Sequence, residues 1–402
     1  MTPELGARMT KGAGTLAEKM ASRLIGLAAV AILSAAVTLA PLMAFADAPL
    51  YFDGAKGVFT DGSDVLKSDS DALKAIINGK GASAAHNGAA ASSPPSLSLS
   101  SLNAAANSRN SLLLGMSTII NPDIWHTETD VLYRHISEVE YGGERSAWGQ
   151  AFGSRQDMDT GLGLSVSQKH WGVVIGMDNP FDVSCDRLAT GFMLGYGKAD
   201  RDFDIGDSST KSFFASVYAK YDLGSGAYIA GNLKYNRYDS EFDVKGVDSG
   251  SVKQDGYGGS VEAGKKMDIK DGWYWTPSLR YSYMRIQNAD FMTKNGISVF
   301  INDFSSKRLR GAVCFGRGFT LKDGSRLDAW ASVAVLHEFD GKKAYVDGAL
   351  VTPDYSGTWG AYSIGLDWRM RETMSLSAFY EYVKGDNIEQ PWSLGLGLNL
   401  KM

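Results

Sequence analysis

The C-terminal stretch at positions 392–402 reads WSLGLGLNLKM, and its large apolar residues alternate with small or polar ones. Successive side chains of a β-strand point to opposite faces, so this segment would present one apolar face and one small or polar face. A slip of one residue would exchange the two faces, which means that the register is strongly specified. The apolar face consists of Trp392, Leu394, Leu396, Leu398, Leu400 and Met402.

The same period of two recurs throughout the C-terminal part of the chain, from residue 146 onward. An even number of alternating segments is typical of an antiparallel β-barrel in a bacterial outer membrane. We therefore predict an all-β fold, a 12-stranded antiparallel transmembrane β-barrel. Its strands are expected at 146–156, 161–177, 187–202, 210–222, 226–243, 252–268, 272–290, 306–320, 325–340, 356–370, 373–385 and 391–402.

The connections between these segments alternate in length, which distinguishes the barrel from a soluble β-sandwich with the same strand pattern. Barrels have short periplasmic turns at one rim and longer loops at the other. The first pair departs from the rule, with a short loop at 157–160 and a long turn at 178–186. Short turns are expected at 223–225, 269–271, 323–324 and 371–372, and longer joins at 203–209, 244–251, 291–305, 341–355 and 386–390.

Tryptophans lie near the predicted strand ends, where outer-membrane barrels carry girdles of aromatic residues at the two membrane interfaces. The alternative for each residue is a place in a soluble core. The girdle candidates are Trp273, Trp275, Trp359, Trp368 and Trp392.

Composition restricts the class of protein further. Charged residues make up 21% of the chain and hydrophobic residues 44%, which is too polar for a bundle of membrane helices but ordinary for a barrel with a polar lumen. The formal net charge of −5 argues against a nucleic-acid partner. Two cysteines, Cys185 and Cys314, are too few for a disulfide framework, and we expect both to be unpaired.

The N-terminus resembles a secretory signal at residues 1–46. Basic residues precede an apolar run from Leu24 to Met43, and Ala44-Phe45-Ala46 fits the small-x-small rule for cleavage, which we expect after Ala46. An uncleaved membrane helix is the alternative. The long basic region also leaves open a translation start at Met9 or Met20.

Two further regions separate the signal from the barrel at 146–402. Residues 47–120 are partly low-complexity, and we expect a flexible linker in this region. Residues 121–145 hold a helix and a connector. Asn121-Pro122-Asp123 is a helix start, with a capping residue, a proline at the first helical position and an acid in the first turn. Apolar residues then recur at helical spacing, so we predict a helix from Asp123 to Val139.

The order of these features resembles the translocator domain of autotransporters, the type V secretion family, over about residues 120–402. The helix leads into Trp148-Gly149-Gln150-Ala151-Phe152-Gly153, which is similar to that family's first strand. The segments at 172–178, 275–281 and 309–316, and then His337-Glu338-Phe339, follow in the family's order. The resemblance rests on the order and spacing of these segments more than on any single motif.

The resemblance implies a passenger in front of the barrel and a helix inside its lumen. Helix residues Glu128, Asp130, Arg134 and Glu138 would then pair with charges on the lumen face of the strands; the alternative is that these charges only line water. The strand residues concerned are Arg280, Arg308, Arg310, Arg326, Asp328, Glu338 and Glu381.

Two departures from the family pattern concern the ends. The family usually ends in Phe or Trp, which the barrel-assembly machinery reads, whereas this chain ends in Met402 behind Leu398 and Leu400. The passenger, at residues 47–120, is too short for the β-helical shafts typical of the family. Outer-membrane lipid, the assembly machinery and the chain's own N-terminal segment are the expected partners, and we expect a monomer.

Catalytic and cofactor motifs are absent from the sequence, so we predict neither enzyme activity nor a cofactor or metal. The acidic group at 61–71 lacks the pattern of a calcium loop. A minority reading places a hydrolase at the outer rim, with His337, Glu338 and Asp340. Three functions remain: a translocator that exports or displays a short segment, a porin-like or structural barrel without export, and the rim enzyme.

Overall fold

The computed structural model describes residues 51–53, 58–60, 120–138, 145–159, 165–183, 186–223, 225–244, 248–294, 298–339, 344–346, 349–351 and 356–402. Two short N-terminal strands, β1 (Tyr51–Asp53) and β2 (Val58–Thr60), pair antiparallel. The predicted signal at residues 1–46, most of the passenger or linker region and Cys185 lie outside the described residues.

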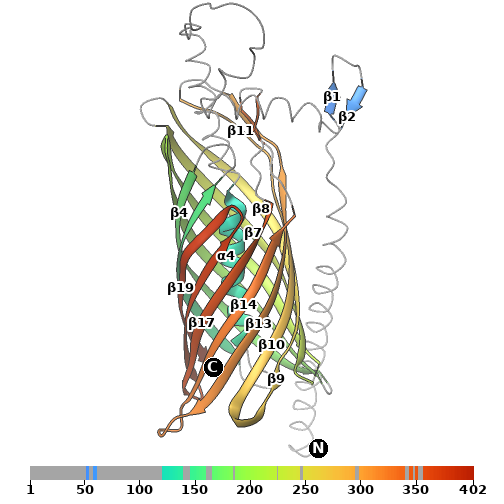
Figure 1. The fold of residues 1–402 in the computed structure, drawn as a ribbon, viewed down its shortest axis with the longest axis vertical. Coiled ribbons are helices and arrows are strands. Elements are labelled where there is room, and N and C mark those ends of the chain that lie inside the picture. The colour runs from blue at the N-terminus through green and yellow to red at the C-terminus, as the bar shows by residue number, and fades with distance from the viewer. Residues whose placement is uncertain are drawn as a thin grey trace, which may run out of the picture.

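A closed antiparallel barrel of twelve strands forms the body of the described chain (Figure 1). The ring of strands is continuous, because the last strand, β19, pairs with the first, β3, and β10 pairs with both β8 and β13. The strands are β3 (Ser146–Asp159), β4 (Ser165–Val183), β5 (Asp186–Phe203), β6 (Gly206–Asp222), β7 (Ala227–Val244), β8 (Asp248–Lys265) with its extension β9 (Met267–Asp268), β10 (Trp273–Ile286), β13 (Phe304–Thr320), β14 (Arg326–Glu338), β17 (Gly357–Arg371), β18 (Met374–Gly385) and β19 (Ile388–Lys401). The predicted fold class and strand number are confirmed.

The two rims of the barrel differ. The C-terminus lies at the lower rim in Figure 1, where the Met402 amide donates to the Arg145 carbonyl at 2.7 Å. We call this rim, which also holds the tight turns after β6, β8, β13 and β17, the terminal rim. One turn contains the single-turn helix η1 (Lys270–Gly272), and in another Ser325 donates to Asp323, which lowers the pKa of that carboxyl group. We call the opposite end the loop rim.

The loop rim carries an additional sheet that the sequence did not predict. Its strands are β11 (Ala289–Met292), β12 (Ser298–Ile301), β15 (Ala344–Val346) and β16 (Ala349–Val351), in the order β11-β12-β15-β16. They belong to the connections on either side of β13 and β14. The long joins predicted at 291–305 and 341–355 are therefore partly ordered as strands.

Four predicted connection lengths are wrong. A long join was expected at 244–251, but only residues 245–247 separate β7 from β8. Long joins were expected at 203–209 and 386–390, but only residues 204–205 separate β5 from β6, and only residues 386–387 separate β18 from β19. The predicted long turn at 178–186 shrinks in the same way, because β4 runs to Val183 and β5 begins at Asp186. The backbone hydrogen-bond ladder continues past the apolar part of each strand, where the hydrophobic period no longer marks it.

The outer face of the barrel is apolar, as the final strand illustrates. Leu396 is 69% exposed, and Leu394, Leu398, Leu400 and Met402 are also exposed. On the inner face, glycine occurs where a neighbouring aromatic ring fills the space that a side chain would take. A Cβ at Gly395, for example, would lie 2.2 Å from the Phe379 ring. No helix within the described ranges is long and apolar enough to cross a membrane.

One member of the predicted tryptophan girdle is misplaced. Trp273 is exposed on the outer face, and Trp275 stacks on the exposed Phe315 with ring centroids 6.2 Å apart. Trp359, in contrast, is only 2% exposed and lies inside the barrel, where its indole NH donates to Asn387 at 3.2 Å. Trp359 shares the inward face of β17 with Ala361 and Ser363, so its position near a strand end does not put it at the membrane interface.

Candidate functional site

The lumen of the barrel contains the helix α4 (Asn121–Glu138), which lies within one or two residues of the predicted range (Figure 1). Its side chains are buried on nearly every face, as expected for a helix surrounded by a barrel wall. Asn121, predicted as a capping residue, accepts a hydrogen bond from the Arg201 guanidinium at 3.0 Å instead. The first residue of the helix is thereby attached to β5.

The loop-rim end of the lumen is filled by apolar side chains. Ile120, Ile124 and Trp125 of the helix segment are fully buried and belong to one continuous core cluster. We call this cluster the outer seal. Its strand residues come from most of the barrel and from β11 and β12, and they include Met158, Phe203, Tyr238, Phe242, Met284, Ile286, Ala289, Val299, Ile301, Phe304, Leu336, Trp359 and Ile388.

A second apolar cluster attaches the other half of the helix to one side of the barrel. Val131, Leu132 and Ile136 pack against residues of β3 to β7, among them Trp148 and Phe214. The C-terminal half of the helix therefore packs directly against this side of the barrel wall. The opposite side, formed by β10, β13, β14, β17 and β18, carries most of the charged lumen residues that the sequence singled out.

A fully buried ion pair joins the middle of the helix to β7. Glu128 and Lys234 are each 0% exposed, and Lys234 Nζ lies 2.7 Å from Glu128 Oε2. Lys234 also donates to the Trp125 carbonyl at 2.9 Å, and Asn236 donates to Glu128 at 2.6 Å. The prediction named Glu128 but missed both partners. Their position on the inward face of a strand was the signal that could have found them.

On the opposite side, the structure places the predicted arginines against the helix. Arg280 pairs with Asp130, and Arg308 contacts Asp123 at 3.1 Å. Arg134 and Arg310 both approach Glu381 at 3.0 Å, so that one strand carboxylate bridges a helix arginine and a strand arginine. Charge-assisted bonds of this kind are stronger than neutral ones and fix geometry.

Three other predicted residues have different surroundings. Glu338 accepts from Ser306 at 2.8 Å and from Arg308 at 3.2 Å, and it lies 3.8 Å from His126 of the helix. Arg326 and Asp328 pair with each other at 3.0 Å near the terminal rim.

A polar cluster that the sequence did not predict holds the C-terminal turn of the helix. His135 Nε2 lies 3.0 Å from Asp178, which also accepts hydrogen bonds from Ser146 and Tyr218, each at 2.6 Å. The His135 ring stacks on Trp148 with centroids 3.9 Å apart. Lys220 donates to the Ile136 carbonyl at 2.8 Å, a favourable place for a cation at a helix C-terminus.

A cavity of about 600 Å³ remains beside the helix in the terminal-rim half of the lumen. Charged side chains of both signs line it, including Asp130, Arg134, Glu138, Arg310, Asp328 and Lys401. Cys314 also faces this cavity and forms no disulfide within the described residues. The lumen is thus polar toward the terminal rim and closed by the outer seal toward the loop rim.

The residues of the rim-enzyme reading do not come together. His337 bonds Thr358 at 2.9 Å and packs against the exposed Phe339, whereas Glu338 is buried in the lumen. Adjacent residues of a strand point to opposite faces, so the barrel wall separates the two side chains. Asp340 lies outside the described residues. Within the described ranges, no group of three potential ligands could hold a metal ion.

The fold and the occupied lumen define an outer-membrane barrel with an internal helix. The autotransporter β-domain family model matches residues 147–381, and the chain belongs to the autotransporter family. It therefore resides in the bacterial outer membrane. With short turns on the periplasmic side, the terminal rim faces the periplasm and the loop rim faces the exterior.

Named relatives support this assignment. The chain is 30% identical over 281 residues to the pertactin autotransporter of Bordetella bronchiseptica, a match covering 68% of this chain and 31% of that protein. Identity to the BrkA autotransporter of Bordetella pertussis is 27% over 283 residues, covering 67% of this chain and 27% of the relative. The match thus spans about a third of these relatives' length.

Solved structures show the same fold. The β-domain of the Bordetella autotransporter BrkA gives a TM-score of 0.57 at 24% identity, covering 64% of this chain and 100% of that one. The translocator domain of NalP from Neisseria meningitidis gives 0.54 at 16% identity, covering 70% and 98% of the two chains.

Proposed function

We propose that this protein is a translocator that exports a short N-terminal passenger, residues 47–120, and then retains helix α4 as a plug. The path of the helix carries the proposal: its N-terminal end lies in the outer seal, and its C-terminal end leads to β3 at the terminal rim. A chain threaded in this direction leaves the barrel on the exterior side.

The lumen charges have a positioning role in this proposal. Apolar contacts hold the helix in place but are non-directional, whereas ion pairs such as Glu128–Lys234 specify its height and rotation. Arg280, Arg308, Arg310 and Glu381 act in the same way from the opposite wall. Arg326, Asp328 and Glu338 line the lumen around this contact region.

The ends of the chain have processing roles in the same proposal. Residues 1–46 form a signal that is cleaved after Ala46, with Ala44 as the other small residue of the site. Leu398, Leu400 and Met402 form an exposed apolar row on the outer face of the last strand, which the barrel-assembly machinery would read. The barrel at 146–402 would function as a monomer without enzyme activity.

Surface proteolysis of intact cells tests export. A protease added outside should remove residues 47–111 and leave the barrel intact. A protease site inserted in the turn at 321–325 on the terminal rim is the matched control, and it should be cut only after the outer membrane is opened. Protection of 47–111 on intact cells, with cleavage after opening, would contradict export and favour the porin-like alternative.

A further inference from the structure

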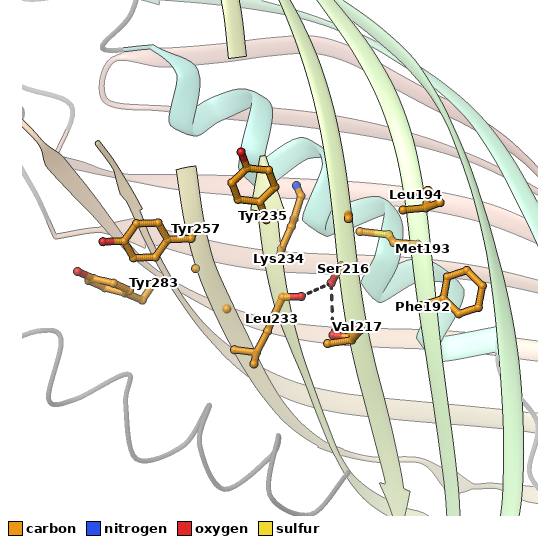
Figure 2. Close-up of a pocket in the computed structure, with 13 residues that line it drawn as sticks. Phe192, Met193, Leu194, Ser216, Val217, Leu233, Lys234, Tyr235, Tyr257 and Tyr283 are labelled. Carbon is orange, nitrogen blue, oxygen red and sulfur yellow. Dashed lines mark hydrogen bonds between the residues drawn. The ribbon is translucent and has the colours of Figure 1, made fainter. Parts of the chain in front are cut away.

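The outer face of strands β5 to β10 contains a groove of about 490 Å³, lined almost entirely by apolar atoms (Figure 2). Ala215 and Gly259 form its floor, because neither carries a large side chain on the outward face. Its walls are Phe192, Leu194, Val217, Leu233, Tyr235 and Tyr257. This volume lies within the range of about 300–1,000 Å³ that small-ligand pockets occupy.

An aromatic row lies directly beyond the groove, toward the loop rim. Trp171, Tyr196 and Phe213 project from β4, β5 and β6, and their ring centroids are 5.9 Å and 5.0 Å apart along the row. Such rows mark the level at which the acyl region of a bilayer gives way to its headgroups. The groove therefore lies at the level of acyl chains in the outer leaflet.

Cations follow at the next level on the same strands and the same face. Lys198 and Lys211 are direct cross-strand partners on β5 and β6. Like charges directly opposite each other are unfavourable on a sheet, and an anion between them would relieve the repulsion. Arg237 of β7 and Lys253 of β8 extend the group, and their side chains are 54% and 64% exposed.

Acidic neighbours hold three of these four cations only weakly. Lys211 lies 3.9 Å from Glu241, Arg237 lies 3.7 Å from Asp255, and Lys253 lies 3.6 Å from Asp239. Lys198 has a closer partner, Asp200, at 2.7 Å. Exposed pairs at such distances contribute little to stability, so a phosphate could replace the carboxylates as partner.

We propose that this face binds a phosphorylated lipid with several acyl chains, of the lipid A type, from the outer leaflet. An acyl chain would occupy the groove, and a phosphate group would lie between Lys198 and Lys211. The two lysines are four residues beyond Leu194 and Ala215 along their strands, or about 14 Å at roughly 3.4 Å per residue. That separation places the headgroup contacts above the aromatic row.

Native mass spectrometry of the full chain in detergent tests the proposal, with diphosphorylated lipid A as the probe. The variant K198Q/K211Q should lose lipid adducts roughly 25-fold, about five-fold for each lysine near an anionic surface. Ala215→Leu, which fills the groove floor, should also reduce binding. The matched controls are K265Q/K322Q near the terminal rim and Ala331→Leu, which lies on the outer face between Phe315 and Ile364. These controls should bind as the unmodified chain does.

Each alternative gives a distinct result. Equal binding of lipid A whose phosphates have been removed, or of phosphatidylglycerol, would overturn the proposal, as would equal losses in the controls. A dimer that Ala215→Leu abolishes would assign the groove to a second copy of the chain instead. Heat-modifiable gel mobility shows that each variant is a folded barrel, so reduced adducts cannot be attributed to misfolding.

Discussion

Replacing Lys234 by methionine should loosen helix α4 from its place in the lumen. The substitution keeps most of the side-chain volume but removes the cation that lies 2.7 Å from Glu128 and donates to the Trp125 carbonyl. Glu128 would remain buried with Asn236 as its main hydrogen-bond donor. Breaking a buried pair by removing one partner costs about 3–5 kcal/mol.

In the unplugged state we expect Glu128 to reach water, so its charge is hydrated there. The cost therefore falls on the plugged state and shifts the equilibrium toward the unplugged one. Since 1.4 kcal/mol is a factor of ten, the ratio of unplugged to plugged barrels should rise by at least roughly 100-fold. Single barrels in planar lipid bilayers report this ratio as the fraction of time spent in a high-conductance state. The Lys234→Met protein should open far more often than the unmodified protein.

Two comparisons make the measurement decisive. In the double variant Glu128→Gln, Lys234→Met, no uncompensated charge remains, so openings should fall back toward the unmodified level. Lys384→Met removes the cation of an exposed pair, in which Lys384 lies 3.2 Å from Glu389, and it should change the ratio little. The reasoning is refuted if Lys234→Met opens as rarely as the unmodified protein, or if the double variant opens at least as often as Lys234→Met alone.

Three further outcomes are expected. Deleting residues 121–141 should raise channel conductance in planar bilayers, and unchanged conductance would contradict the plug. Gly395→Ala should reduce the yield of heat-modifiable folded barrel by overpacking Phe379 at a cost of about 1–3 kcal/mol, whereas Gly153→Ala, whose Cβ would have its nearest neighbour at 3.6 Å, should not. N-terminal sequencing of the mature protein should begin at Asp47; a mature chain that starts before Leu24 would exclude the signal.

The barrel could be predicted because its signal is local. Each strand alternates within its own sequence, as at 392–402, and the alternation gives strand, face and register together. The helix was predicted for the same reason, since Asn121-Pro122-Asp123 and the spacing after it lie in one segment. Connection lengths were predicted less well, because the hydrogen-bond ladder extends beyond the apolar residues that marked each strand.

The lumen contacts were harder to predict, because they join residues distant in sequence. Glu128 and Lys234 are 106 positions apart, and nothing near either residue indicates the other. The misplaced Trp359 has a different cause. Its place near the end of the strand suggested a membrane interface. However, Trp359 alternates in step with Ala361 and Ser363, and this already placed its side chain on the inward face. Face parity therefore outweighs position along the strand when a residue is assigned to lipid or lumen.

The two halves of the lumen have different tasks in a plugged translocator. The outer seal excludes water with apolar side chains from the helix, the barrel and β11 and β12, so it resists ion flow at the exterior end. The terminal-rim half leaves a charged cavity of about 600 Å³ beside the helix. Ions from the periplasm can therefore enter the terminal-rim half of the lumen, but the outer seal stops them from crossing the barrel. It follows that substitutions at Ile124 or Trp125 should raise basal ion leakage, while charge changes at Arg280 or Arg310 should mainly alter how firmly the helix is held.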